Sequence, residues 1–211
     1  MINIVIPSIN RNTLKYTIDS LLKQTNSDWE CWVGFDGFEK GEIDEKTLIN
    51  DERVHYLYFP SQNNVNKHSE KPGLVRNLII ESISNNRPWI GFVDDDDMLE
   101  KHYVELVKFE IENRQFDSCV FRMRSDIANT KITPSFLNMT MSKNYQIEEN
   151  DIGISFIVNK KYITENNIKF SDKEVEQYHF LNDIKEREGK IYMSNFLSYN
   201  VNGSKYCEYK L

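Results

Sequence analysis

The most constraining feature of this sequence is a short apolar run, PWIGFV at residues 88–93, that leads without a break into four aspartates, Asp94 to Asp97. A run that is apolar at successive positions predicts a strand buried on both faces, as central strands of parallel sheets are. Similar runs lie at 2–7, 29–35 and 53–59, and helical periodicity predicts helices at 14–24 and 73–84. We therefore expect an α/β fold with a Rossmann-like, mostly parallel central sheet flanked by helices.

The second half of the chain continues this pattern less regularly. We expect helices at 103–113 and 174–188, strands at 118–123, 152–158 and 190–193, and loops within 124–151. A chain of 211 residues without an internal repeat or a Gly/Ser/Pro linker suits one domain. The expected single domain spans residues 1–211.

Charge and hydropathy exclude several classes of protein. The formal net charge is −7 and the basic residues are scattered, so we expect no nucleic-acid partner. No apolar run approaches the roughly 18 residues of a membrane-spanning helix, so we expect no transmembrane segment. The first ten residues lack the basic region of a signal peptide, so the expected compartment is the cytoplasm.

Four adjacent carboxylates at a strand end repel one another, by about 1 kcal/mol per near pair in solvent. One interpretation is a solvated loop that leads into a helix N-terminus, where aspartate is favourable. The other is a divalent cation such as Mg²⁺ or Mn²⁺, which prefers carboxylate, water and phosphate oxygens. The glycine and glutamate spacing of an EF-hand is missing, and so are the GxGxxG and GK[ST] phosphate-binding motifs.

Three stretches together resemble the family 2 glycosyltransferases of the GT-A fold. They are IVIPSINRNTLKYTIDSLLKQT at 4–25, WVGFDG at 32–37, and GLVRNLIIESISNNRPWIGFVDDDDML at 73–99. The resemblance is carried mainly by the first half of the chain. It makes residues 1–100 the expected nucleotide-sugar-binding half and residues 101–211 the expected acceptor and catalytic half, with acceptor loops within 124–151. It implies inverting transfer of a sugar from a nucleotide-diphosphate donor to a glycan or other hydroxyl acceptor. It also implies a divalent metal, Mn²⁺ or Mg²⁺, bound at a DxD motif.

The resemblance assigns donor-binding roles to residues near the strand ends. Asp36 would accept a hydrogen bond from the imide N–H of uracil or thymine, so a UDP-sugar is the expected donor, with dTDP- or GDP-sugars as alternatives. Pro7 and Ser8 would lie against the base, and Ile9 stands where many relatives have tyrosine. Arg76 matches an arginine near the nucleotide, where a guanidinium suits phosphate or base oxygens.

The resemblance also assigns the metal ligands. Asp96 matches the principal ligand, while Asp94 and Asp95 match positions that contact the metal, its waters or the ribose. Asp94 is thus both a donor-binding and a metal-ligand candidate. Asp97 is expected to be a helix cap or to support the ligands indirectly.

The general base is less directly assigned. Relatives have a Glu-Asp pair at the start of a late helix, and here Glu176-Gln177 occupies its place. Glutamine cannot accept the proton of an acceptor hydroxyl, so Glu176 is the expected base, with Glu174 and then Asp172 as alternatives.

Two other functions remain open at this point. An apolar strand followed by aspartates is also typical of haloacid-dehalogenase-type phosphohydrolases, in which the first aspartate is the nucleophile. A GT-A module that binds sugar nucleotides without catalysing transfer would equally tolerate the loss of the Glu-Asp pair.

Overall fold

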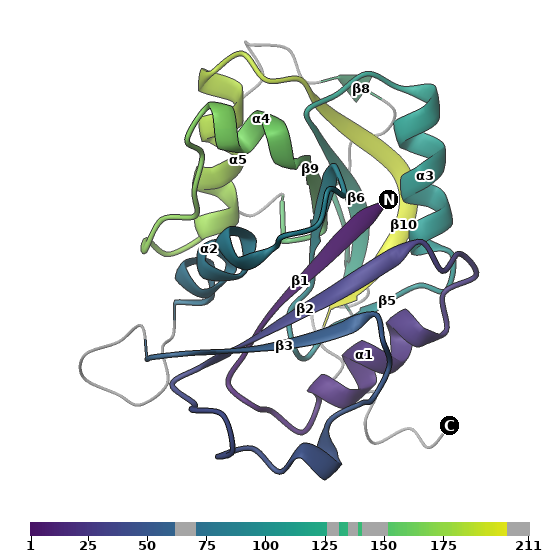
Figure 1. The fold of residues 1–211 in the computed structure, drawn as a ribbon. Helices are drawn as coiled ribbons and strands as arrows, with labels where there is room; N and C mark the ends of the chain where they lie inside the picture. The colour runs from purple at the N-terminus through teal and green to yellow at the C-terminus, as the bar shows by residue number, and fades with distance from the viewer. Residues whose placement is uncertain (62–70, 126–130, 135–138, 141–151, 202–211) are drawn as a thin grey trace.

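The computed structural model describes residues 1–61, 71–125, 131–134, 139–140 and 152–201. A single sheet runs through this part of the chain, in the strand order β3-β2-β1-β4-β9-β6-β10-β5 (Figure 1). Its strands are β1 Ile2–Ser8, β2 Trp29–Asp36, β3 Val54–Phe59, β4 Trp89–Phe92, β5 Met98–Leu99, β6 Ser118–Ser125, β9 Phe156–Asn159 and β10 Ile191–Val201. Two short strands, β7 Lys131–Thr133 and β8 Met139–Thr140, pair with β6 and β10.

The sheet is mostly parallel, as the sequence predicted. Strands β3, β2, β1 and β4 are parallel neighbours. Strand β9 is antiparallel to both β4 and β6, and β10 is parallel to β6. Strands β6 and β10 therefore run in the same direction as the first four, and the sheet joins both halves of the chain in one α/β domain.

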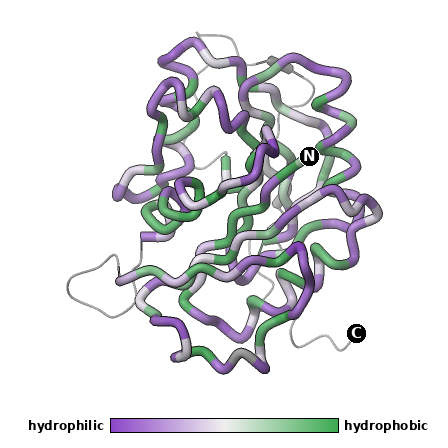
Figure 2. The backbone as a smooth tube through the Cα atoms, viewed as in Figure 1, coloured by the Kyte–Doolittle hydropathy of each residue, from purple (hydrophilic) through white to green (hydrophobic). Residues whose placement is uncertain are grey.

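The helices cover both faces of this sheet. In Figure 1, α2 Pro72–Ser82, α4 Lys160–Glu165 and α5 Glu176–Glu186 lie on one side of it, and α1 Leu14–Leu22 and α3 Tyr103–Asn113 lie on the other. A 3₁₀ turn, η1 Glu45–Thr47, lies between β2 and β3. Figure 2 shows hydrophobic residues concentrated along the central strands, between these two helical layers.

The core on the α2 and α5 side contains four aromatic rings. All four are at most 3% exposed: Phe92 of β4, Phe156 of β9, Phe170 in the loop between α4 and α5, and Phe180 of α5. The Phe170 and Phe180 rings stack with centroids 4.3 Å apart, and Phe92 meets Phe170 edge-on at 5.1 Å. Through this cluster α5 packs against the end of the sheet where the four aspartates lie.

Several sequence predictions of local structure were wrong. The strand expected at 152–158 begins only at Phe156, and the last strand extends to Val201 instead of ending at 193. Helix α4 was not predicted; it is only six residues long, and its signal is Asn159, whose side chain accepts a hydrogen bond from the Tyr162 amide at 3.1 Å. Within the acceptor loops expected at 124–151, residues 126–130, 135–138 and 141–151 lie outside the described residues.

In the described residues, no helix combines the length and the apolar character needed to cross a bilayer.

Candidate active site

The candidate site lies at the carboxyl edge of the parallel strands. Asp94 to Asp97 follow β4 after one intervening residue, Val93. In the sheet β1 lies between β4 and β2; β1 ends at Ser8 and β2 ends at Asp36. Pro7, Ser8 and Asp36 are buried, whereas Ile9 is half-buried. The three neighbouring strands thus bring the predicted base-binding and metal-binding residues to one edge of the sheet, where ligands bind in such folds.

The loop after β1 contacts the acidic loop. The Ser8 hydroxyl donates to Asp95 Oδ2 at 2.7 Å. Arg11 Nη1 donates to Asp95 Oδ1 at 3.0 Å and to Asp96 Oδ2 at 3.1 Å. Sequence reasoning did not select Arg11. Its signal was a single basic residue just after the first strand, on the same sheet edge as the aspartates.

Helices α2 and α5 contact the other side of the acidic loop. Arg76 of α2 is buried, and its guanidinium donates to Asp94 and to Glu176. Glu176, the first residue of α5, also accepts a hydrogen bond from the Gly73 amide at 2.8 Å. Arg76 therefore contacts two predicted site residues, one on each side.

The fourth aspartate faces inward. Asp97 is 4% exposed, and one of its oxygens accepts a hydrogen bond from the Tyr199 hydroxyl at 2.6 Å. The same hydroxyl accepts a hydrogen bond from the Asp94 amide at 3.2 Å. Because Tyr199 belongs to β10, the last strand thus fixes the backbone of the acidic loop. Asp97 thus contacts β10, and its expected role in supporting the metal ligands stays a prediction.

Burial and mutual repulsion make the ionised form of the acidic loop less favourable. Burial raises the pKa of the Asp95 carboxyl, and the neighbouring Asp96 and Asp94 add to that effect, although Ser8 and Arg11 oppose it. Burial also raises the pKa of Asp96, with Asp94 acting in the same direction and Arg11 against it. A raised carboxyl pKa means that the ionised form is less favourable here than in water. A cation bound beside these groups would favour the ionised form.

A cavity of about 420 Å³ opens next to the acidic loop. Its lining includes Arg76, Asp94, Glu174, Glu176, Gln177 and Tyr199. Glu174 is exposed. Asp36 is not among the described residues that line this cavity, so the predicted base-binding and catalytic residues lie on different parts of the same edge.

The segment before α5 has a strained backbone. Val175 has φ 52° and ψ 46°, the left-handed region that β-branched residues rarely adopt. Such conformations cost about 1–3 kcal/mol and cluster at functional sites. The strain lies between Glu174 and Glu176, the two candidate bases.

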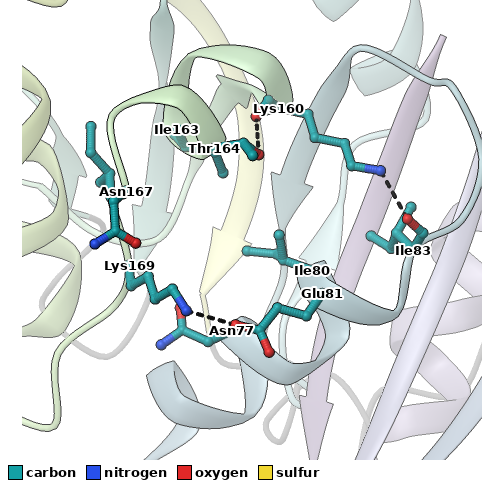
Figure 3. A pocket seen from close by; sticks show the side chains of 10 residues that line it. Asn77, Ile80, Glu81, Ile83, Lys160, Ile163, Thr164, Asn167 and Lys169 are labelled. Atoms are coloured by element: carbon teal, nitrogen blue, oxygen red, sulfur yellow. Dashed lines mark hydrogen bonds and ion pairs between the residues drawn. The ribbon is translucent and has the colours of Figure 1, made fainter.

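A second hollow, of about 410 Å³, lies between α2 and α4 (Figure 3). The polar contacts among its lining residues connect α2 to α4 and to the segment that follows α4. Lys160 Nζ donates to the Ile83 carbonyl at 2.9 Å, where α2 ends, and Lys169 pairs with Glu81 at 2.7 Å across the rim. None of the predicted site residues lines this hollow.

Comparison with known proteins agrees with this geometry. The model of the family described as Glycosyl transferase family 2 matches residues 3–166. The chain is 29% identical over 157 residues to "Uncharacterized glycosyltransferase EpsJ" of Bacillus subtilis (strain 168), covering 71% of this chain and 42% of that protein. It is 32% identical over 124 residues to "Glycosyltransferase GlyA" of Streptococcus pneumoniae, covering 56% of this chain and 16% of that protein. The chain thus spans less than half the length of these relatives.

Solved structures show the same fold. S. aureus TarS superposes with a TM-score of 0.73 at 17% identity, covering 95% of this chain and 36% of that one. TarS 1–349 in complex with UDP gives 0.71 at 18% identity, covering 95% and 60%. With the acidic loop after β4 and the matched residues 3–166, these findings place the chain in the glycosyltransferase family 2, with the GT-A fold.

Proposed function

We propose that this chain catalyses metal-dependent, inverting transfer of a sugar from a UDP-sugar to a hydroxyl group of a glycan or other acceptor. The observation that carries the proposal is the acidic loop Asp94 to Asp97, which lies beside a cavity that Arg76 and Glu174 also line. Structures of TarS in complex with UDP and with UDP-GlcNAc support a nucleotide-sugar donor. The family assignment leaves the phosphohydrolase alternative without support.

The acidic loop fits a hard divalent cation. The side chains of Asp94 and Asp96 are 39% and 32% exposed, so their oxygens are accessible, and each aspartate raises the pKa of a neighbour. In the described part of the chain, no group of three or more His, Cys, Asp or Glu side chains is arranged to hold a metal ion by itself. A Mg²⁺ or Mn²⁺ ion would therefore need the donor phosphates and water as further ligands beside one or two carboxylates.

Breaking the bond between the sugar and the diphosphate places negative charge on the leaving group. A bound divalent cation would supply charge stabilisation for that group. Asp96 and Asp94 would hold the cation, while Arg11 beside them could turn its exposed guanidinium from the carboxylates toward the diphosphate. Asp36, Pro7, Ser8 and Ile9 would bind the nucleoside from the adjacent strand ends.

The acceptor hydroxyl must lose its proton to a carboxylate within hydrogen-bond reach. Glu174 is exposed and lines the cavity. Glu176 lines the cavity too, but its two oxygens accept hydrogen bonds from Gly73 and Arg76. We therefore propose Glu174 as the base.

Donor binding tests the proposal directly. We expect UDP with Mn²⁺ to raise the thermal unfolding midpoint of the chain, since a ligand at 100 times its Kd adds about 2.7 kcal/mol to stability. We expect a smaller rise with UDP alone, and less with GDP or dTDP. The measurement is a thermal-shift panel of UDP-, dTDP- and GDP-sugars with and without Mn²⁺. Equal shifts with and without the metal would contradict metal dependence, and no shift with any nucleotide would contradict the transferase.

Turnover distinguishes an enzyme from a binding module. We expect Glu174→Gln to lower kcat roughly 100-fold with donor affinity retained, because removing a general base affects proton transfer and not the ground state. The matched control is Glu165→Gln, an exposed glutamate of α4 that pairs with Lys161 at 3.7 Å. Sugar transfer from the donor that binds most tightly is the measurement. Tight donor binding without any turnover in the unsubstituted chain would support the non-catalytic module instead.

A further inference from the structure

One buried arginine, Arg76, joins the carboxylate at the start of α5 to Asp94, a proposed metal ligand. The Arg76 side chain is 2% exposed and donates to Glu176 and Asp94, whose side chains are 11% and 39% exposed. Glu176 lies 100 residues from Arg76 in the sequence, and Asp94 lies 18 residues away. The arginine thus connects the start of α5 to the acidic loop.

Two hydrogen bonds fix the position of the Glu176 carboxylate. Its carboxylate receives hydrogen bonds from Arg76 and from the Gly73 amide near the start of α2. A Cβ at position 73 would lie 2.4 Å from Glu176 Oε2, so glycine is what allows this close approach. Burial raises the pKa of Glu176, and the Arg76 charge is the largest effect that opposes the rise.

Arg76 depends on its two carboxylate partners in turn. An arginine cannot deprotonate in a protein, so its buried charge requires anions. Its Nε is buried and has no hydrogen-bond partner within the described residues. Within the described residues, the hydrogen bonds that orient the guanidinium are therefore those to Glu176 and Asp94. If Glu176 lost its charge, the guanidinium would be balanced by Asp94 alone and would draw that carboxylate inward.

We propose that Glu176 is a positioning residue that acts through Arg76 on Asp94. By sharing the arginine, Glu176 would leave the second oxygen of the half-exposed Asp94 side chain available to hold the cation. This inference rests on the proposed function. It assigns to Glu176 a role in metal and donor binding in place of the role of general base.

The test compares Mn²⁺ binding and kinetics in Glu176→Gln, which keeps the size of the side chain and removes its charge. We expect the Kd of Mn²⁺ in the presence of UDP, measured by calorimetry, to rise about tenfold, and the KM for the donor to rise with it. The matched control is Glu81→Gln on α2, the helix that carries Arg76; its carboxylate pairs with Lys169 on the rim of the other hollow (Figure 3), and there we expect no change. A drop in kcat with unchanged Mn²⁺ affinity and KM would make Glu176 the base and overturn the inference.

A second variant removes no charge. Gly73→Ala pushes the Glu176 carboxylate away from its place, so we expect the same loss of Mn²⁺ affinity as in Glu176→Gln. Gly73→Ala can replace Glu176→Gln in the test if circular dichroism shows that Glu176→Gln does not fold. Wild-type Mn²⁺ affinity in a folded Gly73→Ala protein would overturn the inference while leaving the proposed function intact. If the unsubstituted chain bound neither Mn²⁺ nor UDP, the proposed function would fail first.

Discussion

Replacing Asp96 by asparagine is expected to lower kcat/KM for sugar transfer by about 10³ to 10⁴. A metal that stabilises the departing diphosphate contributes several kcal/mol to the transition state, and each 1.36 kcal/mol is a factor of ten in rate. Asparagine keeps the shape of the side chain but removes the charge that would hold the cation. Mn²⁺ should then no longer increase the affinity for UDP, which calorimetry measures independently of turnover.

The matched control for this prediction is the next residue along the chain. Asp97 faces the Tyr199 hydroxyl, and an asparagine oxygen can accept the same hydrogen bond. We expect Asp97→Asn to lower kcat/KM by less than about tenfold and to keep the response to Mn²⁺. If Asp97→Asn abolished the Mn²⁺ response while Asp96→Asn kept it, the assignment of the metal ligand would be wrong.

Replacing Phe180 by alanine is expected to lower the free energy of unfolding by about 3–5 kcal/mol, the usual cost of emptying a fully buried aromatic site. The Phe180 ring is 0% exposed and packs against the rings of Phe170, Phe156 and Phe92. That cost is a large part of the 5–15 kcal/mol that stabilises a typical domain. Urea unfolding followed by fluorescence or circular dichroism measures it.

Phe109→Ala on α3 provides the comparison. Phe109 is 46% exposed and meets the ring of Phe196 edge-on, with centroids 5.7 Å apart. We expect this substitution to cost under about 1 kcal/mol, because little apolar area leaves water when Phe109 packs. Equal losses in the two variants would mean that the four-ring cluster does not anchor α5, and the placement of Glu174 and Glu176 would need another explanation.

Some elements of the chain have the bounds that the sequence predicted, and others do not. Helix α3 was predicted with the bounds that it has, Tyr103–Asn113, and the first four strands were predicted to within one or two residues. These elements have uninterrupted apolar periodicity, which depends only on neighbours in the sequence. Strand β10 was predicted too short because Ser194 and Ser198, both buried, interrupt its apolar pattern. The Ser194 hydroxyl donates a hydrogen bond to Glu110 Oε1 of α3 at 2.6 Å, a contact that no local sequence pattern predicts.

The sequence by itself determined that this is an α/β chain with an acidic loop at the carboxyl end of a buried strand, because hydrophobic periodicity and the succession of elements along the chain depend only on neighbouring residues. Only the tertiary structure decided which groups meet that loop. Arg11 reaches Asp95 across 84 positions, Glu176 reaches Arg76 across 100, and Tyr199 reaches Asp97 across 102. These contacts depend on the strand order of the sheet, in which antiparallel β9 lies between β4 and β6. No spacing within the sequence encodes that order directly, because it follows from how the whole chain buries its apolar faces.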